Sequence, residues 1–352
     1  MASVQFPSIG FGIVGLGLIA DFHAQAIASA TGAKLVGACG RSLEKARAFA
    51  AKHGAPCATT SLDELLARPD LHVLCIATPS GAHLEPSLAA ARAGKHIVIE
   101  KPLEITLARL DELLRATSAA GVKVMPIFQS RFGDGARTVK AALTAGRLGR
   151  LALSSAYVKW QRSAEYYRES WHGTRALDGG GALINQAIHA IDLLQWFAGM
   201  PSEVFSWNTR RVHTRIEVED TAVATLRFPD GGLGVIEAST AVHPGWARRI
   251  ELCGEHGSVL LEDDRIVRWD FRDARPEDAA ILAAKADDQM RSGASSPSAI
   301  SHVGHQRQIE NLIAAINTGA PLAVDGPGAR KAVALILALY ASAERGVPVA
   351  VV

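Results

Sequence analysis

The feature that most constrains this chain is a glycine-rich turn near its start, which joins an apolar run to a helical pattern. Residues 9–14 form the apolar run, and Gly15-Leu16-Gly17 and then Ala20 follow it. Gly15 permits a tight strand-to-helix turn, Gly17 allows a pyrophosphate to approach the backbone, and Ala20 lets the helix pack close to the strand. Phosphates would bind the unpaired N–H groups of the first helical turn. The pattern therefore predicts a dinucleotide-binding unit.

The composition favours a soluble enzyme of two domains. The chain has 352 residues, of which 48% are hydrophobic, enough to supply two cores. The net charge is +2, so the electrostatics predict binding neither to nucleic acid nor to an anionic membrane. No apolar run approaches the ~20 residues that span a bilayer, and residues 1–7 lack the basic start of a signal peptide, so we expect a cytoplasmic protein. The scattered cysteines are expected to be buried, reduced thiols: Cys39, Cys57, Cys75 and Cys253.

Two regions of different pattern follow one another along the chain. Up to about residue 127, short apolar runs alternate with alanine-rich helical stretches, which predicts βαβ units and a parallel sheet. From residue 151, strand-like runs joined by short turns indicate an antiparallel sheet. Residues 181–197 are typical of one amphipathic helix, and residues 286–300 of a surface loop. We therefore predict an α/β protein with a Rossmann domain over residues 1–127 and a strand-rich second domain over residues 128–352.

Four further motifs give the chain a family resemblance. They are Ala77-Thr78-Pro79-Ser80 with His83, Glu100-Lys101-Pro102, Gly179-Gly180-Gly181 with Asn185, His189 and Asp192, and Asp325-Gly326 with Gly328. Together with the first glycine pattern, they make nearly the whole chain resemble the glucose–fructose oxidoreductase, inositol dehydrogenase and rhizopine catabolism (Gfo/Idh/MocA) family. The resemblance implies a second domain with a large, open, predominantly antiparallel sheet. It also implies an NAD(P)-dependent oxidoreductase that transfers a hydride between nicotinamide and a CH–OH carbon of a sugar, sugar derivative or cyclitol.

Lys101, His189 and Asn185 are the catalytic residues that the resemblance implies. Lys101 ends a strand at the carboxyl edge of the parallel sheet, where ligands bind, although a lysine there is often only solvated. Its ammonium would stabilise negative charge on the substrate oxygen, and His189 would exchange the hydroxyl proton. Asn185 stands where many family members have aspartate; it supplies no negative charge, and Asn185→Asp is expected to be tolerated. Asp192 either orients the His189 ring, caps a helix or forms a buried salt bridge.

The end of the second predicted strand favours NADP over NAD. It is Cys39-Gly40-Arg41-Ser42 and contains no acid that could hold the ribose diol of NAD. Arg41 would neutralise a 2′-phosphate and Ser42 would hydrogen-bond it; the alternative is a surface arginine and a serine that only caps the next helix. The residues expected to bind the cofactor are Gly15, Gly17, Leu18, Ile19, Arg41, Ser42, Thr78, Pro79, His83, Glu100 and Lys101.

A cationic and aromatic cluster before the triple glycine suggests a sugar pocket. Aromatic faces stack on sugar C–H surfaces and polar tips hold hydroxyls, although an interface loop could have the same composition. The positive residues favour an acidic sugar or a nucleotide sugar. The expected substrate contacts are Gln129, Arg131, Lys159, Arg162, Tyr166, Trp171, His172 and Asp192. No cysteine and histidine cluster has metal-ligand spacing, so no metal is expected.

Two other functions are compatible with the same motifs. One is an NAD-dependent glycosidase that oxidises its sugar transiently, and the other is a cofactor-binding regulator without catalysis. Retention of Lys101 and His189 argues against the regulator.

The second domain also predicts a homodimer or homotetramer. Alternating apolar residues, as in Leu226-x-Phe228 and Leu233-x-Val235, indicate a sheet face with too few helices to cover it. Family members often pair through this sheet. The Glu-Lys-Pro resemblance further predicts a cis peptide between Lys101 and Pro102, against the low base rate of such bonds.

Overall fold

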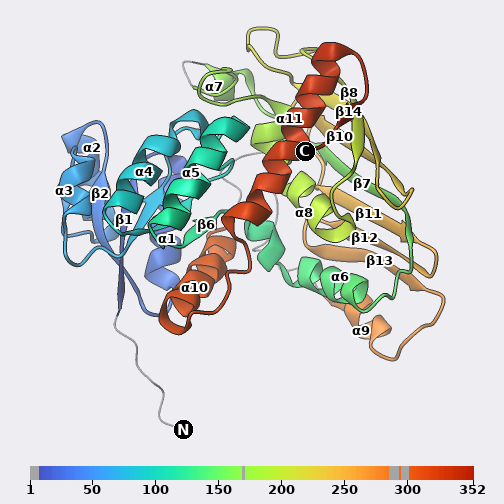
Figure 1. Ribbon diagram of the computed structural model, residues 1–352, viewed down its shortest axis with the longest axis horizontal. Helices are drawn as coiled ribbons and strands as arrows, with labels where there is room; N and C mark the ends of the chain where they lie inside the picture. Colours follow the sequence, from blue (N-terminus) through green and yellow to red (C-terminus); the bar gives the residue numbers. More distant parts are fainter. Residues whose placement is uncertain (1–7, 169–170, 285–292, 295–300) are drawn as a thin grey trace. The chain divides into compact units, whose positions relative to one another are not determined.

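A computed structural model describes residues 8–168, 171–284, 293–294 and 301–352 (Figure 1). The chain divides into two compact units, one of residues 1–129 and 302–329 and the other of residues 130–301 and 330–352. The first boundary lies close to the predicted one at residue 127. The division differs from the predicted one because residues 302–329 belong to the first unit. The surface loop predicted over residues 286–300 lies outside the described residues, apart from Gly293 and Ala294.

In the described residues, the first unit contains a six-stranded parallel sheet in the order β3-β2-β1-β4-β5-β6. Its strands are β1 Ile9–Val14, β2 Ala33–Cys39, β3 Ala58–Thr59, β4 Val73–Ile76, β5 His96–Ile99 and β6 Val124–Pro126. Its helices are α1 Leu18–Ser29, α2 Leu43–His53, α3 Leu62–Leu66, α4 Leu84–Arg92, α5 Leu107–Ala119 and α10 Val303–Thr318, with a 3₁₀ turn over Ser80–Ala82. The order reverses between β1 and β4, which is the switch point where doubly wound sheets bind ligands.

The helix α10 packs on the first unit although it comes from the late part of the chain. Gln306 donates from Nε2 to the Ser29 carbonyl at 3.1 Å, which joins α10 to the end of α1. Gln308 donates from Nε2 to the Pro126 carbonyl at 2.9 Å, which joins α10 to β6. A pattern that depends on neighbours in sequence does not reveal such a return.

The second unit is built on an eight-stranded sheet, in the described residues, with the order β13-β12-β11-β7-β10-β9-β8-β14. The strands are β7 Leu151–Lys159, β8 Glu203–Thr209, β9 Thr221–Arg227, β10 Leu233–Ser239, β11 Arg249–Gly254, β12 Gly257–Glu262, β13 Arg265–Phe271 and β14 Val349–Ala350. The helices are α6 Asp134–Thr144, α7 Ala164–Tyr167, a π-helical turn Ala182–Ala187, α8 Ile188–Ala198, α9 Asp278–Ala283 and α11 Gly326–Arg345, and a 3₁₀ turn spans Gln129–Phe132. Among the strands that the structure describes, only β7 and β10 pair in parallel, so the predicted mostly antiparallel sheet is confirmed.

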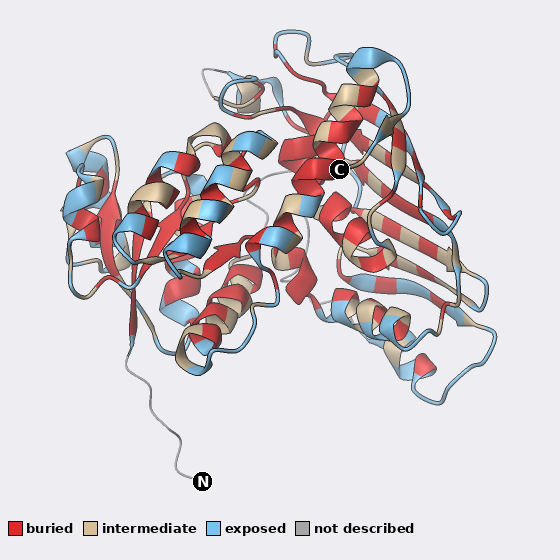
Figure 2. Ribbon diagram, in the orientation of Figure 1, coloured by how far each residue is buried: buried red, intermediate tan, exposed pale blue. Residues whose placement is uncertain are grey.

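One face of this sheet is covered by helices and the other is open (Figure 2). Along β9, buried residues that include Leu226 alternate with exposed ones that include Val223. Leu226 and Phe228 were expected on the uncovered face. This expectation is wrong, because both side chains are buried on the covered side. Leu233 is on the open face and is 52% exposed.

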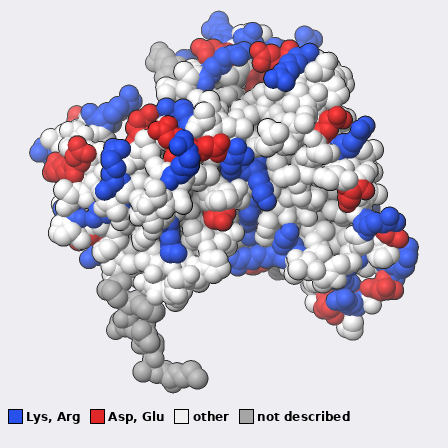
Figure 3. Space-filling model, in the orientation of Figure 1, with Lys and Arg blue, Asp and Glu red and all other residues white. Residues whose placement is uncertain are grey.

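Several smaller expectations have structural answers. The Lys101–Pro102 peptide is cis, as predicted. All four cysteines are free; Cys39 and Cys75 are buried, whereas the other two are only half-buried. Among the helices of the described ranges, none combines the length and the apolar character needed to cross a membrane. Charged side chains of both signs are interspersed over the molecular face in Figure 3.

Candidate active site

The carboxyl ends of the parallel strands bring most of the predicted cofactor residues to one edge of the first unit's sheet. Gly15 follows β1 and Arg41 lies just beyond β2, while Thr78 and Lys101 follow β4 and β5. Gly15 has φ of +87°, and a Cβ on it would lie 2.6 Å from the Ala77 carbonyl. Only glycine fits this turn, which passes the end of β4 at the switch point.

The start of α1 fits the pyrophosphate of a dinucleotide. Gly17 is the N-cap of α1, and no side chain caps the helix there. A Cβ on Gly17 would meet no atom within 4 Å, so the space before the helix is open. Leu18 and Ile19 supply the first N–H groups, at the end of the helix that carries partial positive charge. NAD(P) phosphates therefore fit this turn.

Arg41 and Ser42 have different environments at the end of β2. Arg41 is exposed, so its guanidinium is accessible to a ligand. Ser42 is the N-cap of α2, and its Oγ accepts the Lys45 N–H at 3.3 Å. The capping interpretation of Ser42 is confirmed. A hydroxyl that accepts one bond still has its own hydrogen to donate, so capping does not remove Ser42 from a phosphate site.

His83 does not reach the ligand edge. The side chain is fully buried, with Nδ1 2.8 Å from the Pro102 carbonyl and Nε2 2.9 Å from the Thr78 carbonyl. Burial lowers the pKa of His83, against the opposing effect of the two carbonyls. The expected cofactor contact of His83 is therefore corrected: the ring joins the half-buried Thr78-Pro79 turn to the Pro102 segment. The Thr78 hydroxyl is also engaged, because it donates to the Ala82 carbonyl at 2.8 Å.

Glu100 and Gln129 flank Lys101 at the same edge. Glu100 is only 6% exposed, and its Oε2 accepts the Lys101 backbone N–H at 3.2 Å. The expectation that Glu100 contacts the cofactor stays a prediction, because low exposure alone does not exclude a ligand contact. Lys101 itself is half-buried. Gln129 lies beyond β6, and its Oε1 has no hydrogen-bond partner in the part of the chain that the structure describes. Because this oxygen is itself buried, the ligand contact expected for Gln129 stays a prediction.

In the second unit, the triple glycine lets two buried side chains approach the backbone. Glu219 accepts the Gly181 N–H at 3.0 Å and the Leu183 N–H at 2.9 Å, and Tyr340 donates its hydroxyl to Glu219 at 2.9 Å. A Cβ on Gly180 would lie 2.1 Å from the Tyr340 hydroxyl, and one on Gly181 would lie 1.8 Å from the Glu219 carbonyl. Sequence reasoning missed Glu219 and Tyr340, because both are far from the glycines along the chain.

The helix that follows differs from the single amphipathic helix predicted over residues 181–197. A π-helical turn over Ala182–Ala187 precedes α8, and such turns are frequent at functional sites. Residues 180–195 are all described, and among them only His189 is not buried. This stretch is therefore enclosed on nearly every side, and His189 is its one partly exposed residue before Trp196.

Asn185 belongs to a series of hydrogen-bonded side chains that ends on a carboxylate. Its Nδ2 donates to Asp178 in a short contact, and its Oδ1 accepts from Gln186 Nε2 at 3.0 Å. Gln186 Oε1 accepts in turn from Arg162 Nη2 at 2.6 Å. Asp178 is 1% exposed, and its second oxygen accepts the Gly173 N–H at 2.8 Å. Asp178 thus places a buried carboxylate beside Asn185, which sequence reasoning missed because the residue stands before the glycines.

Arg162 is a buried cation at the other end of this hydrogen-bonded series. It is 4% exposed, donates from Nη1 to the Gln161 carbonyl at 2.7 Å, and lies 5.1 Å from the centre of the Trp160 ring. Among the described residues, no acid forms an ion pair with it. Burial lowers the pKa of Arg162, as expected for a poorly compensated charge. A ligand carboxylate or phosphate would complete this environment.

The predicted aromatic cluster is assembled around Arg162. The Tyr166 ring stacks on His172 with centroids 4.3 Å apart, and Trp171 lies 4.0 Å from His172. The Tyr166 hydroxyl accepts from Gln186 Nε2 at 3.1 Å. Three of the predicted substrate contacts therefore share one location, and they are linked to Asn185 through Gln186.

Three other predicted substrate contacts are corrected. Arg131 and Asp192 form a buried bidentate ion pair, with Nε–Oδ2 at 2.7 Å and Nη2–Oδ1 at 2.5 Å. The buried salt bridge that was one alternative for Asp192 is confirmed, and the two charges compensate each other. Lys159 pairs with Glu237 at 2.8 Å on the open face of the sheet, where it lines a hollow of about 260 Å³. Adjacent strand residues point to opposite faces, which separates Lys159 from the buried Trp160 and Arg162.

Known proteins match the chain along most of its length. Residues 9–128 match an oxidoreductase family with an NAD-binding Rossmann fold, and residues 136–260 match the GFO/IDH/MocA C-terminal domain. A myo-inositol 2-dehydrogenase from Thermotoga maritima is 29% identical over 261 residues, which cover 72% of this chain and 75% of that protein.

Solved structures agree with this match. The WlbA dehydrogenase from Bordetella pertussis, in complex with NADH and UDP-GlcNAcA, has a TM-score of 0.90 and 32% identity, covering 99% of both chains. The WlbA dehydrogenase from Chromobacterium violaceum, with the same two ligands, has a TM-score of 0.87 and 29% identity, covering 99% of this chain and 98% of that one.

Proposed function

This chain belongs to the GFO/IDH/MocA family of oxidoreductases, and we propose that its substrate is a nucleotide sugar that carries a carboxylate. As a family member, it is an NAD(P)-dependent oxidoreductase that acts at a CH–OH carbon of a sugar, sugar derivative or cyclitol. The observation that carries the substrate proposal is Arg162, a buried guanidinium that two side-chain amides connect to Asp178. A carboxylate on the sugar would bind this cation directly.

Two relatives support the same substrate class. The WlbA structures contain UDP-GlcNAcA, a uridine diphosphate sugar with an acidic group, and their identities to this chain are 32% and 29%. The aromatic rings of Tyr166 and Trp171 offer surfaces for the sugar face. The polar chain through Gln186 and Asn185 offers groups for its hydroxyls.

The chemistry divides among three side chains. The nicotinamide, when bound, accepts or supplies the hydride. Lys101 hydrogen-bonds the substrate oxygen and stabilises the negative charge that develops there. His189 exchanges the hydroxyl proton, for which an accessible imidazole is suited. Asn185, held by Asp178, orients the substrate or the imidazole and carries no proton.

The test of this function follows the near-ultraviolet absorbance of reduced nicotinamide with UDP-GlcNAcA, UDP-GlcNAc and myo-inositol. Net reduction with UDP-GlcNAcA above all is expected. Turnover of myo-inositol alone would reject the acidic nucleotide sugar but keep the oxidoreductase. Hydrolysis of an aryl glycoside without net cofactor reduction would indicate the glycosidase instead.

For the cofactor, NADP is proposed to bind more tightly than NAD. Arg41 is exposed at the end of β2, in a position to meet a 2′-phosphate, and Ser42 can donate its hydroxyl hydrogen to the same group. The related structures contain NADH, so both cofactors belong in the titration. Tighter binding of NAD would reject this preference and leave the family function unchanged.

A homodimer or homotetramer through the open sheet face is part of the proposal. Large apolar side chains remain exposed there: Leu153 at 51%, Trp207 at 61%, Val223 at 42% and Leu233 at 52%. Ion pairs such as Lys159–Glu237 lie among them, so the face offers both charges to a second copy. Light scattering that detects only monomer would reject this assembly. A cytoplasmic location also stays a prediction, supported by the four free thiols.

A further inference from the structure

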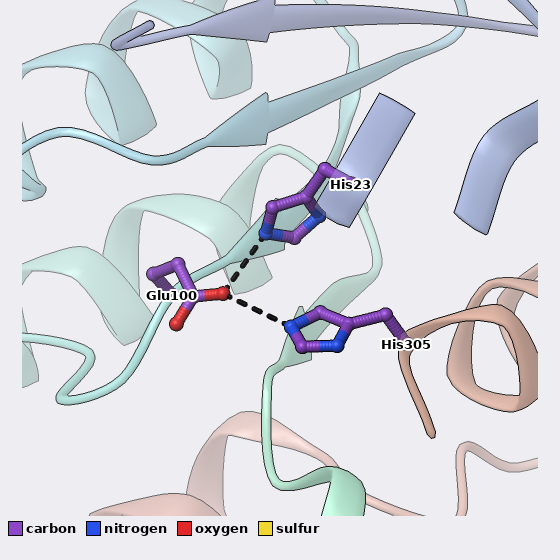
Figure 4. Close-up of side chains that lie close together, drawn as sticks. All are labelled: His23, Glu100 and His305. Carbon is purple, nitrogen blue, oxygen red and sulfur yellow. Dashed lines mark hydrogen bonds and ion pairs between the residues drawn. The ribbon is translucent and has the colours of Figure 1, made fainter. Parts of the chain in front are cut away.

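Three buried titratable side chains of the first unit meet beneath the end of β5 (Figure 4). His23 comes from α1, Glu100 from the end of β5 and His305 from α10. Glu100 Oε1 lies 2.9 Å from His23 Nε2 and 3.3 Å from His305 Nε2. The two rings meet edge to face with centroids 5.1 Å apart. No role in hydride or proton transfer requires this cluster, so its purpose needs a separate explanation.

The hydrogen-bond pattern assigns the donor and acceptor atoms of the cluster. A carboxylate oxygen accepts, so both imidazoles donate from Nε2. Their Nδ1 atoms have no hydrogen-bond partner within the described residues, so the bonds to Glu100 are the ones that hold the two rings. Burial raises the pKa of Glu100, but the bonds from His23 and His305 outweigh it and leave the pKa well below the usual range. Glu100 is therefore an ionised carboxylate that two rings hold in place.

The other oxygen of Glu100 connects the cluster to the ligand edge. Its Oε2 accepts the backbone N–H of Lys101 at 3.2 Å. The Glu100 N–H itself donates to the Ile76 carbonyl at 3.0 Å, which fixes the main chain against the end of β4. One carboxylate thus accepts from three N–H groups, one of which belongs to the lysine of the proposed reaction.

We propose that His23 and His305 are positioning residues, which hold Glu100 so that its carboxylate fixes the backbone of Lys101. The inference rests on the proposed role of Lys101. It also assigns a function to the return of the chain, because α10 delivers His305 to a site assembled from the first hundred residues. A catalytic group misplaced by about 1 Å can lower the rate ~10²-fold, so fixing the backbone of Lys101 can have a large effect on kcat.

A divalent metal is the competing occupant of the same atoms. Two imidazoles and a carboxylate are a common ligand set, and their donor atoms lie within 4.8 Å of one another. The hydrogen-bond interpretation is favoured because both nitrogens approach the same oxygen at hydrogen-bond distance. Metal analysis of the purified full-length protein separates the two: one tightly bound equivalent of zinc or another divalent metal would overturn the proposal.

The variants separate positioning from general stability. His305→Leu removes the donor to Glu100, whereas His305→Gln keeps an N–H near the same place. Gln308→Leu is the matched control, because Gln308 is equally buried on α10 but donates to the Pro126 carbonyl. All three should lower the melting temperature, so thermal stability alone decides nothing.

The readouts are kcat, the cofactor Kd and hydrogen exchange at the Lys101 amide. For His305→Leu we expect kcat to fall about 10–100-fold, the range of a lost bond to a charged group, with a cofactor Kd within about threefold of wild type. Exchange at the Lys101 amide should accelerate. His305→Gln should recover most of the loss, and Gln308→Leu should show neither effect.

Each failure has a distinct signature. Normal kcat and normal Lys101 exchange in His305→Leu would overturn the positioning role, as would an equal loss of kcat in Gln308→Leu. If the wild-type protein oxidises no sugar at all, the proposed function fails. The exchange measurement then still decides whether the cluster fixes the Lys101 backbone, because it requires neither substrate nor cofactor.

Discussion

The two units build their ligand contacts in different ways. In the first unit the groups suited to cofactor binding belong mainly to the backbone. They are a turn at Gly15, an uncapped helix start at Gly17 and the ends of parallel strands. In the second unit they are side chains joined in series from Asp178 through Asn185 and Gln186 to Arg162. A backbone site depends on a few glycines, whereas a side-chain series depends on every member and on residues distant in sequence.

This difference predicts which kinetic property a substitution in each unit should change. Changes at the edge of the first sheet should alter cofactor affinity, except at Lys101, whose side chain is proposed to act on the substrate. Changes in the series of the second unit should alter kcat and the choice of substrate. The following variants test that difference between the two units.

The largest effect is expected from the two residues with proposed chemical roles. Lys101→Ala and His189→Ala should each lower kcat roughly 10²–10⁴-fold, because both act on charge or protons in the transition state. The cofactor Kd should change little, which titration calorimetry can measure. A His189→Ala enzyme with near-normal kcat over the whole accessible pH range would remove the acid/base role from His189.

The next effect comes from the pair Asn185 and Asp178. Asn185→Asp places a second carboxylate against the buried Asp178, and like charges raise the pKa of one member. The pair keeps a shared proton at low pH and loses it as pH rises, so kcat should fall with rising pH. We expect kcat to fall about 10–100-fold at a pH one to two units above the apparent pKa of the pair, because the protonated fraction falls tenfold for each pH unit.

The exchanged double variant, Asp178→Asn with Asn185→Asp, is the control for this pair. It restores one charge and one amide and should recover most of the activity. These expectations replace the tolerance that the sequence alone suggested for Asn185→Asp. A single Asn185→Asp variant with a flat pH profile and full activity would show that the two side chains do not interact in this way.

A smaller effect is expected at Arg41. Arg41→Ala should weaken NADP binding by about 1–3 kcal/mol, the scale of a charge-assisted hydrogen bond, and leave NAD nearly unchanged. Fluorescence titration of both cofactors measures the difference. Equal losses for NADP and NAD would mean that Arg41 stacks on the adenine or stabilises the fold without reading the 2′-phosphate.

The smallest effect on catalysis is expected on the open sheet face. Trp207→Glu introduces a charge where a side chain is 61% exposed, and it should dissociate the proposed oligomer. Because this face lies opposite the helix-covered side that carries His189, kcat should stay within about twofold, as for a surface change. Light scattering of wild type and variant gives the assembly state, and an unchanged mass would exclude this face as the interface.

The sequence predicted local features well and distant contacts poorly. The glycine turn, the strand ends and the aromatic cluster follow from residues adjacent in the chain, and the structure has them close to the predicted positions. The ion pair of Arg131 with Asp192 joins residues far apart in sequence, so two expected substrate contacts were misassigned. Lys159 was misassigned for another reason, since a shift of one residue along a strand changes the face.

Glu219, Tyr340 and Asp178 show what a pattern of residue types cannot provide. The triple glycine signals a close approach but does not say which side chains approach. Glu219 and Tyr340 fill that space, and only the folded chain brings them there. Asp178 adjoins the motif, yet an acid before glycines is an ordinary turn residue until its contact with Asn185 is seen.

The most direct test of the proposed function compares kcat/KM for UDP-GlcNAcA and UDP-GlcNAc, which differ in the acidic group of the sugar. In the wild-type enzyme we expect at least about 10-fold preference for the acidic sugar, the value of one charge-assisted contact. Arg162→Gln should abolish that preference while leaving the cofactor Kd unchanged. Equal kcat/KM for both sugars in the wild-type enzyme, or a preference that survives Arg162→Gln, would contradict the assignment of Arg162 as the residue that recognises the carboxylate.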